Sequence, residues 1–233
     1  MESKETTQVA IKEWFNKTYK LRGDLYLRPV RAYKIFPKIL GVKKGDKILD
    51  VACGLGRLLQ ACAPYNVGSF GVDISDVAVE KAKQNVPNAI IQVANAENIE
   101  FENESFDHIS CLGSLERMID LKKVLSEIHR VGNQNAKFCF LVRNKNGLTW
   151  LIKKKLGIVN KAGHQGAKSY DEWQQLFVEN GYKILNVYPD QYPIKKRELF
   201  SSFGLRKIDY ESISNPLIPM KYVHEYIFIL GKA

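Results

Sequence analysis

The sequence has few cysteines, no long apolar run and no apolar stretch behind a basic leader at its start. Its cysteines, Cys53, Cys62, Cys111 and Cys139, lie 9, 49 and 28 positions apart, which matches neither a zinc site nor a small disulfide framework. No apolar run approaches the roughly 18 residues of a membrane span. We therefore expect reduced core cysteines in a cytoplasmic protein that has no metal site and no secretory signal.

The composition excludes other classes of protein. Hydrophobic residues make up 45% of the 233 residues and charged residues 26%, ordinary globular values that exclude wholesale disorder and a fibrous repeat. The length favours one domain with appendages. We expect an aromatic-rich helical segment over residues 1–40 and a main domain over residues 41–233, with insertions at 144–168 and 190–221.

The two halves of the chain differ in charge. Residues 1–120 contain 16 basic and 16 acidic residues, whereas residues 121–233 contain 19 and 9, so the second half carries the whole net charge of +10. Between Lys137 and Lys168 there are eight basic residues and no acidic one. Such an excess indicates either an anionic partner or a solvated basic face.

Apolar runs alternate with helical patterns along the chain. This alternation is typical of a parallel sheet covered by helices. The expected strands cover residues 47–51, 69–73, 89–94, 106–112, 136–143, 182–188 and 223–230, and the expected helices cover 56–64, 76–86, 119–131 and 170–180.

The most informative segment is the first expected strand with the turn after it, ILDVACGLGRLL. The strand ends near Asp50, and Gly54 and Gly56 then allow the backbone to approach a ligand before a helix begins. The dinucleotide fingerprint is incomplete, because Leu59 stands where its third glycine belongs. The acid ahead of the glycines repels a pyrophosphate but attracts a cationic amino-acid group.

A second acid indicates the rest of the ligand. Asp73 ends the second expected strand, 23 residues after Asp50, where a carboxylate can accept both hydroxyls of a ribose. An adenosine with a positively charged tail meets both requirements. S-adenosylmethionine (SAM) is such a molecule.

Four motifs in order resemble the class I SAM-dependent methyltransferases, in particular the ubiquinone/menaquinone methyltransferases: LDVACGLGRLL, GVDIS, NAENIEFENESFD and CLGSLERMIDLKKVLSEIHRV. The resemblance covers residues 48–144 and, more loosely, 170–188. It implies an α/β enzyme with a Rossmann-like, doubly wound, seven-stranded sheet, mostly parallel with an antiparallel last strand. It also implies a helical lid over residues 1–40, SAM as the cofactor and S-adenosylhomocysteine (SAH) as the product.

The resemblance further assigns a cofactor site that runs from the methionine end of SAM to its adenine. The expected cofactor-binding residues are Asp50, Ala52, Cys53, Gly54 and Gly56 for the methionine end, Asp73 for the ribose, Ile74, Asn95 and Ala96 for the adenine, and Leu112 and Gly113 for the floor near the methyl group.

The sequence departs from the family pattern at three positions. Ala52 replaces the first glycine of the turn, a small change that we expect to cost little. Asn95 replaces a usual aspartate, and its side-chain carbonyl can still accept a hydrogen bond from the adenine amino group. Arg117 replaces a frequent histidine. Arginine keeps its proton but can clamp a carboxylate or phosphate, so we expect Arg117 to act on the acceptor.

The histidines are the other catalytic candidates. His164 lies in a Gly-His-Gln-Gly loop that, by resemblance, caps the acceptor pocket, and neighbouring cations favour its neutral imidazole. We expect His164 to be catalytic, although a base is needed only if the acceptor is a hydroxyl or a similar acid. His108, His129 and His224 are expected to be structural or on the surface.

The acceptor is the least determined part of the prediction. The segment TWLIKKKLGIV, residues 149–159, combines apolar residues with three lysines. Such a segment can lie on an anionic membrane, follow the phosphates of RNA or pack over the pocket as a lid. We expect transfer to an O, N or C atom of an anionic small-molecule or lipid-linked metabolite, in the cytoplasm or at the inner face of the membrane.

Two alternatives stay open at this point, as does the oligomeric state. An RNA methyltransferase would use the basic half of the chain. Against it, LGSLERM stands where base amino-group methylation has an N-P-P-Y type of sequence, and aromatic residues do not alternate with the basic run. A non-catalytic protein of the same fold would bind SAM or a partner, but the two acids Asp50 and Asp73 count against it.

Overall fold

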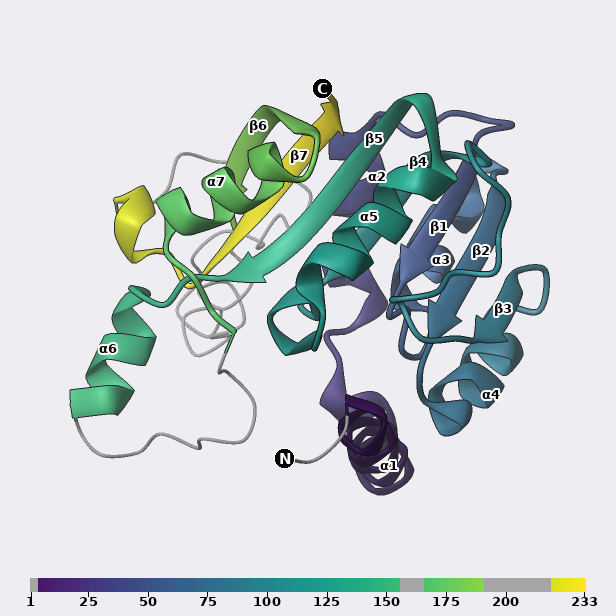
Figure 1. Cartoon of the computed structure of the whole chain (residues 1–233). Coiled ribbons are helices and arrows are strands. Elements are labelled where there is room, and N and C mark those ends of the chain that lie inside the picture. The colour runs from purple at the N-terminus through teal and green to yellow at the C-terminus, as the bar shows by residue number, and fades with distance from the viewer. Residues whose placement is uncertain (1–3, 156–165, 191–218) are drawn as a thin grey trace, which may run out of the picture.

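The computed structural model describes residues 4–155, 166–190 and 219–233. Its centre is a seven-stranded sheet with the order β3-β2-β1-β4-β5-β7-β6 (Figure 1). β7 runs antiparallel to its neighbours β5 and β6, and the other pairs are parallel. This confirms the predicted fold class. The strands are β1 (Lys47–Val51), β2 (Gly68–Asp73), β3 (Ile90–Val93), β4 (Phe106–Leu112), β5 (Gly132–Arg143), β6 (Tyr182–Pro189) and β7 (Glu225–Lys232).

Helices cover both faces of the sheet, and a hydrophobic core lies on each side. Val124 of α5 and Trp173 of α7 belong to one core. Phe36 of α2, Leu59 of α3 and Ala82 of α4 belong to the other. All four cysteines are buried and free, as predicted. The helices on these faces are α2 (Ile35–Leu40), α3 (Arg57–Cys62), α4 (Asp76–Asn85), α5 (Leu121–Val131) and α7 (Tyr170–Glu179).

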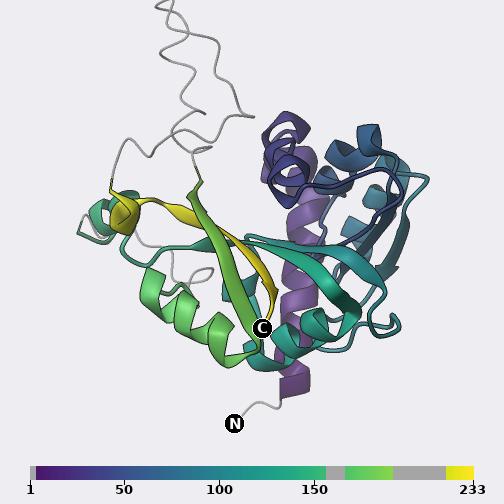
Figure 2. The same cartoon turned by 90° about the horizontal axis from the view of Figure 1, so that it is seen from above.

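The N-terminal segment lies outside the sheet. Helix α1 (Lys4–Arg22) crosses the edge at which β1 and β2 end, and the chain then returns to α2 (Figures 1 and 2). Short 3₁₀ turns follow α1 at Gly23–Tyr26 and Val30–Tyr33. The parallel strands end at this edge, so α1 lies where open α/β sheets bind their ligands.

The insertion at 144–168 contains a second helix outside the core, α6 (Leu148–Lys155), which extends away from the body of the molecule (Figure 1). Most of the insertion at 190–221 lies outside the described residues. Among the helices that the structure describes, none is both long and apolar enough to cross a membrane.

Candidate active site

The strand order reverses between β1 and β4, and the cavities of the molecule lie at the carboxyl edge beside this reversal. The first cavity lies between α1 and the ends of β2 and β3. The second lies between the β1–α3 turn and the segments around Arg28, Arg143 and Glu225. Both are lined by Phe15, Tyr19, Ala52, Ser114 and Arg117, so the two cavities are adjacent.

The turn between β1 and α3 lines the second cavity, and its first residue, Ala52, lines both cavities. Ala52, Gly54 and Gly56 have φ of 59°, 53° and 73°, a left-handed conformation that only glycine adopts at no cost. Ala52 therefore holds its Cβ in a conformation that disfavours alanine relative to glycine, a source of strain that the sequence alone did not indicate. A Cβ on Gly54 would lie 2.7 Å from the hydroxyl of Tyr19, so this position also requires glycine.

Asp50 is buried at the end of β1 and lines the second cavity. It accepts a hydrogen bond of 2.8 Å from the hydroxyl of Ser110. Burial, with a smaller contribution from the nearby Asp73, raises the pKa of Asp50 to about 7 in spite of the hydrogen bond from Ser110. A cation placed beside this carboxylate would relieve the cost of its buried charge, as the expected ammonium group of the methionine end would.

Asp73 is buried at the end of β2 and lines the first cavity. Its two oxygens accept hydrogen bonds from the backbone N–H of Gly54 (2.8 Å) and of Ser75 (2.9 Å). Burial raises its pKa to about 6 in spite of these bonds. The carboxylate thus ties the β1–α3 turn to the start of α4. Ser75 is the N-cap of α4, with its hydroxyl 3.1 Å from the N–H of Ala78.

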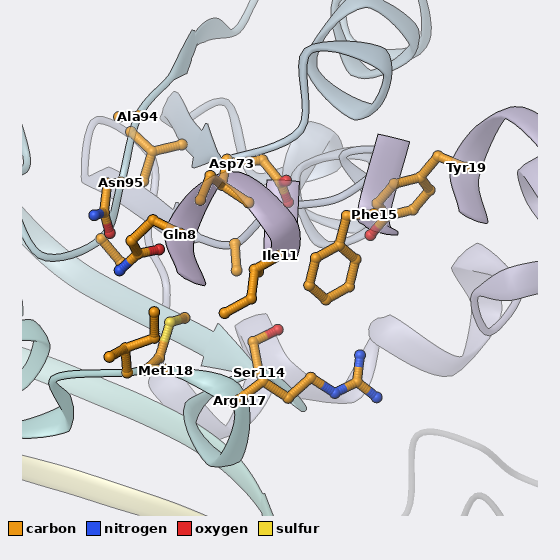
Figure 3. Close-up of a pocket in the computed structure, with 15 residues that line it drawn as sticks. Gln8, Ile11, Phe15, Tyr19, Asp73, Ala94, Asn95, Ser114, Arg117 and Met118 are labelled. Atoms are coloured by element: carbon orange, nitrogen blue, oxygen red, sulfur yellow. The ribbon is translucent and has the colours of Figure 1, made fainter. Parts of the chain in front are cut away.

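Helix α1 covers the first cavity through polar contacts with α4 and with the loop after β3. Asn16 accepts from the hydroxyl of Ser75 (2.6 Å), and Lys12 pairs with Asp76 (2.9 Å). Gln8 donates to Glu97 (2.7 Å). The side chains between these contacts, Ile11, Phe15 and Tyr19, form the outer wall of the cavity (Figure 3).

The adenine residues predicted from the motifs line the inner wall of the same cavity. Ile74 and Ala96 line this cavity together with Asp73. Asn95 lies on the same side of it as Ala94 (Figure 3). The side-chain oxygen of Asn95 accepts from the backbone N–H of Glu97 (3.0 Å), so the turn itself holds this amide. Gly56 differs from the other predicted residues. A Cβ there would lie 3.1 Å from Val86, which shows that this glycine lets α3 and α4 approach each other.

The second cavity has a volume of about 360 Å³, and Cys53, Gly54, Leu112 and Gly113 form its side nearest the turn. A buried ion network forms the far side. Arg28 binds both oxygens of Asp190 (3.0 and 2.8 Å) and also pairs with Glu225. Burial acts to lower the pKa of Arg28, but the two carboxylates raise it above its ordinary value.

Arg143 extends this network toward β4. Its Nε lies 3.4 Å from Glu225 and 3.0 Å from Glu116. Burial raises the pKa of Glu116, although Arg143 opposes the shift. Buried charges at this density are stable only as pairs, so the network fixes where its arginines and acids lie.

Arg117 lines both cavities and so lies at their junction. Figure 3 shows its side chain next to Ser114 in the first cavity. One Nη donates to the hydroxyl of Tyr26 (2.9 Å), and the guanidinium carbon lies 5.7 Å above the ring of Phe15. Its buried Nε has no hydrogen-bond partner among the described residues. An arginine in this position can still donate to an oxyanion that enters the second cavity.

The histidines do not all lie where the sequence predicts. His108 is bound to Asp46 (2.8 Å) and His129 to the carbonyl of Gly181 (3.2 Å), so both are structural, as predicted. His164 lies outside the described residues. His224, predicted to be structural or on the surface, lines the second cavity.

The residues that sequence reasoning missed come from outside the motifs. Three of them, Gln8, Ile11 and Phe15, belong to the aromatic-rich N-terminal segment. Its composition indicates that the segment is buried against another part of the protein. Arg28 and Arg143 carry no local signal, because their partners are distant in sequence. Within the described ranges, no group of three or more His, Cys, Asp or Glu side chains could hold a metal ion.

The two cavities fit SAM in their chemistry. The buried acid of the first suits a ribose, and the buried acid of the second, with its raised pKa, suits an ammonium group. Gly54 lets the side chain of Tyr19, which lines both cavities, approach the backbone of the turn. No pyrophosphate fits this arrangement, because both acids would repel it.

The comparisons with known proteins agree with this chemistry. A family model described as a methyltransferase domain matches residues 49–140. An uncharacterized protein of Methanocaldococcus jannaschii is 36% identical over 154 residues, which are 64% of this chain and 58% of that protein. The chain thus spans less than two thirds of that relative. A crystal structure of a SAM-dependent methyltransferase from Aquifex aeolicus matches with a TM-score of 0.61 at 16% identity, over 93% of this chain and 97% of that one.

A further relative extends the similarity over most of both chains. The ubiquinone biosynthesis O-methyltransferase of Coxiella burnetii is 30% identical over an alignment of 197 residues that covers 80% of this chain and 83% of that enzyme. Its match includes the cofactor motifs and much of the second half. This chain belongs to the class I SAM-dependent methyltransferases, in the group of the ubiquinone/menaquinone methyltransferases, and SAM is its cofactor.

Proposed function

We propose that this protein transfers the methyl group of SAM to a hydroxyl group of an anionic small-molecule or lipid-linked acceptor, such as a quinone precursor. The main observation that supports this proposal is the second cavity. Its volume of about 360 Å³ is in the range of small-molecule sites, and it joins the cofactor turn to Arg117. The Coxiella relative is an O-methyltransferase of ubiquinone biosynthesis, which supports a quinone-type acceptor.

The cofactor lies across both cavities in this proposal. Asp50 and the turn of Ala52, Cys53, Gly54 and Gly56 hold the methionine end, and Asp73 binds the ribose hydroxyls. Ile74, Asn95 and Ala96 surround the adenine, while Leu112 and Gly113 lie under the methyl group. The support for this placement is that all of these residues except Gly56 line one or both cavities.

Methyl transfer from SAM requires the protein mainly to position the two reactants. Bound SAM supplies an activated methyl group on a sulfonium, which is a good leaving group. The chain must then align the acceptor oxygen behind that methyl group and exclude water, and such positioning alone lowers the barrier substantially. Helix α1 closes the first cavity, and we propose that residues 1–40 act as a lid over the cofactor.

Arg117 binds the anionic part of the acceptor in this proposal. Tyr26 and Phe15 fix its guanidinium at the junction of the cavities, so the acceptor carboxylate, phosphate or phenolate is drawn toward the methyl group. An arginine holds its charge at all relevant pH values, and its role here is to orient the acceptor and stabilise negative charge.

His164 also belongs to the acceptor side in this proposal. Gly166, two residues further along, packs so tightly against the carbonyl oxygen of Glu116 that a Cβ there would collide with it. Glu116 precedes Arg117. Gly166 therefore lies against the residue before Arg117, which supports the assignment of His164 to the acceptor side. His164→Ala should reduce turnover while leaving the affinity for SAH unchanged.

Peripheral contact with an anionic membrane would deliver a lipid-linked acceptor. Leu148, Leu151 and Ile152 of α6 are 45%, 39% and 50% exposed, and Lys153, Lys154 and Lys155 follow them directly. Exposed apolar side chains beside a cluster of lysines are typical of a helix that lies on anionic lipid. α6 follows β5, whose last residue Arg143 lines the second cavity.

The test is transfer of label from methyl-labelled SAM into an extract of the source cells, with Asp73→Ala protein as the control. The extract is then separated into RNA, protein, lipid and small-molecule fractions. We expect label in the lipid or small-molecule fraction, with chemistry that identifies a methyl ether. Label released by nuclease would instead establish RNA as the acceptor. Absence of transfer by a protein that still binds SAM would contradict the proposal.

A further inference from the structure

We propose that His224 accepts the proton of the acceptor hydroxyl during methyl transfer. This inference rests on the proposed function and concerns the same site. It assigns a catalytic role to a histidine outside every motif, in a chain where Arg117 occupies the place of the histidine that is frequent in related enzymes.

Few side chains in the second cavity can take up a proton near neutral pH. The described side chains there that titrate or carry charge are arginines, tyrosines, one cysteine, Asp50, Glu225 and His224. Arginine has no free lone pair to accept a proton, and the ordinary pKa of tyrosine, about 10, keeps it protonated. Burial raises the pKa of Cys53 and of Tyr19 well above their ordinary values.

The two carboxylates are committed to other partners. Glu225 lies between Arg28 and Arg143, and both pairs would be broken if it took up a proton. Asp50 is hydrogen-bonded to Ser110 at the end of β1, where it faces the ammonium group of the cofactor in the proposed placement. Among the described lining residues, His224 is then the side chain whose ordinary chemistry suits a general base.

The sheet places His224 at the reacting edge. β7 runs antiparallel to β5, and Glu225 at its start pairs with Arg143 at the end of β5. The parallel strands end at this edge, whereas the antiparallel strand begins there. A residue directly before β7 therefore lies on the cofactor side of the sheet, although it comes near the end of the chain.

The backbone around His224 is held firmly. The buried Asn144 binds this backbone at three carbonyls: its N–H donates to that of His224 (3.1 Å), and its side-chain amide donates to those of Val223 (2.8 Å) and Lys221 (2.9 Å). A Cβ on Gly147 would lie 3.3 Å from the Cα of His224, so this loop also packs closely against it. A fixed backbone is what a positioned base requires.

Charged groups on every side of the cavity complete the arrangement. Arg28 comes from the N-terminal segment, Asp50 from β1, Arg117 from the segment after β4, Arg143 from β5 and Glu225 from β7. Arg117 can stabilise the oxyanion that forms as the proton leaves. His224 can then receive that proton while the oxyanion stays beside a fixed positive charge.

In the proposed step, the acceptor O–H proton passes to a ring nitrogen of neutral His224, which becomes an imidazolium. The oxygen lone pair forms the new O–CH₃ bond as the C–S bond breaks, and its electron pair stays on sulfur, giving neutral SAH. The imidazolium returns its proton to solvent before the next turnover.

The first test uses a phenolic acceptor of known structure, 3,4-dihydroxybenzoate, with SAM. We expect His224→Gln to lower kcat about 100-fold or more, the usual scale for loss of a general base, and to remove the near-neutral limb of the pH profile. The affinity for SAH should stay unchanged in calorimetry. His129→Gln, a histidine that contacts Gly181 away from both cavities, should behave like the wild type.

The second test does not depend on turnover. 4-Nitrocatechol changes colour when its phenol ionises, so its spectrum in complex with SAH and protein reports the proton directly. We expect the bound phenol to ionise at a lower pH with the wild type than with His224→Gln or His224→Asn. Thermal unfolding of both variants establishes that they are folded.

The outcomes separate this inference from the proposed function. If the wild type methylates 3,4-dihydroxybenzoate and His224→Gln does so at the same rate with the same pH profile, the assignment of His224 is wrong and the proposed function stands. If His164→Gln alone abolishes the near-neutral limb, that histidine is the base instead. If the wild type neither binds 4-nitrocatechol nor methylates the acceptor, the phenolic acceptor is wrong and this assignment falls with it.

Discussion

The charged side chains around the two cavities are held in place by different kinds of partner. Around the first cavity, backbone N–H groups of Gly54 and Ser75 hold a buried acid, and all of these groups lie within a short stretch of sequence. Around the second, long side chains hold one another: Arg28 and Glu225 pair although 197 positions separate them. In the proposed function, a local motif thus binds the cofactor, whereas side chains from distant parts of the chain surround the acceptor.

The largest test of this contrast is removal of Arg28. Arg28→Met leaves Asp190 and Glu225 buried without their main counter-charge, so the free energy of unfolding should fall by about 3–5 kcal/mol. Urea unfolding measures this loss. Arg22→Met changes a basic residue on the exposed end of α1 and should shift stability by no more than about 0.5 kcal/mol. Equal stability of the two variants would show that the ion pairs of Arg28 do not stabilise the folded protein.

The next prediction concerns the three lysines that follow Ile152 in the basic half of the chain. Replacing Lys153, Lys154 and Lys155 with Gln should weaken binding to phosphatidylserine vesicles by about 1 kcal/mol per lysine, or roughly 100-fold in all, and flatten its salt dependence. Co-sedimentation over a salt series measures both effects. The matched control replaces Lys43, Lys44 and Lys47 in the neutral half, and it should bind as the wild type does. Equal binding of all three proteins at every salt concentration would show that Lys153, Lys154 and Lys155 are solvated lysines with no role in membrane binding.

Removal of Asp73 tests the cofactor side. Asp73→Ala should weaken SAH binding by about 1–3 kcal/mol, because the ribose loses a charged hydrogen-bond acceptor and the N–H groups of Gly54 and Ser75 lose theirs. Calorimetry measures the affinity. Glu80→Gln removes an exposed acid of the neighbouring α4 and serves as the control. An unchanged affinity would contradict the assignment of the ribose.

The titration of Asp50 gives a smaller effect with a definite sign. Its pKa of about 7 in the unliganded protein means that it must lose a proton to bind an ammonium group. SAH affinity should therefore fall by up to about tenfold per pH unit below 7 and level off above it. Stability without ligand should show the opposite trend, because a carboxyl group with a raised folded pKa contributes stability that is lost as pH rises through about 7.

Asp50→Asn separates these trends from other titrations. The variant cannot ionise at this position, so both pH dependences should flatten, and its affinity at pH 8 should be lower than that of the wild type. Affinity is measured by calorimetry and stability by thermal unfolding over pH 5.5–8. If the wild type and the variant depend on pH to the same extent, Asp50 does not titrate in this range.

The same contrast explains what the sequence could predict. Asp50, Gly54 and Asp73 belong to local motifs that combine strand, turn and acid, so their place at one edge follows from the parallel sheet alone. The sheet itself is predictable because apolar runs and helical patterns alternate. β5 nevertheless begins at Gly132 instead of 136, since α5 ends directly in the strand and no turn separates them.

The acceptor side was not predictable in this way. The family resemblance predicted an antiparallel last strand, and the structure confirms it, but the apolar pattern of the strand gives no sign that His224, directly before it, lines a cavity. Arg28 contacts Asp190 and Glu225 only in the folded chain, because they are far from it in the sequence. Such pairings depend on how segments pack, and a single sequence carries no periodic or local signal for them.

The smallest effect tests whether the cofactor turn carries strain for a purpose. Ala52 has φ of 59°, which costs an alanine about 1–2 kcal/mol, while a glycine there loses roughly 0.4–1 kcal/mol more chain entropy on folding. Ala52→Gly should therefore stabilise the protein by about 0.5–1 kcal/mol in urea unfolding. Ala10→Gly, on an exposed position of α1, should instead destabilise it by a similar amount. If Ala52→Gly also leaves SAH affinity unchanged, the strain serves no role in binding. If affinity falls, the methyl group of Ala52, which lines both cavities, contributes to the fit of the ligand between them.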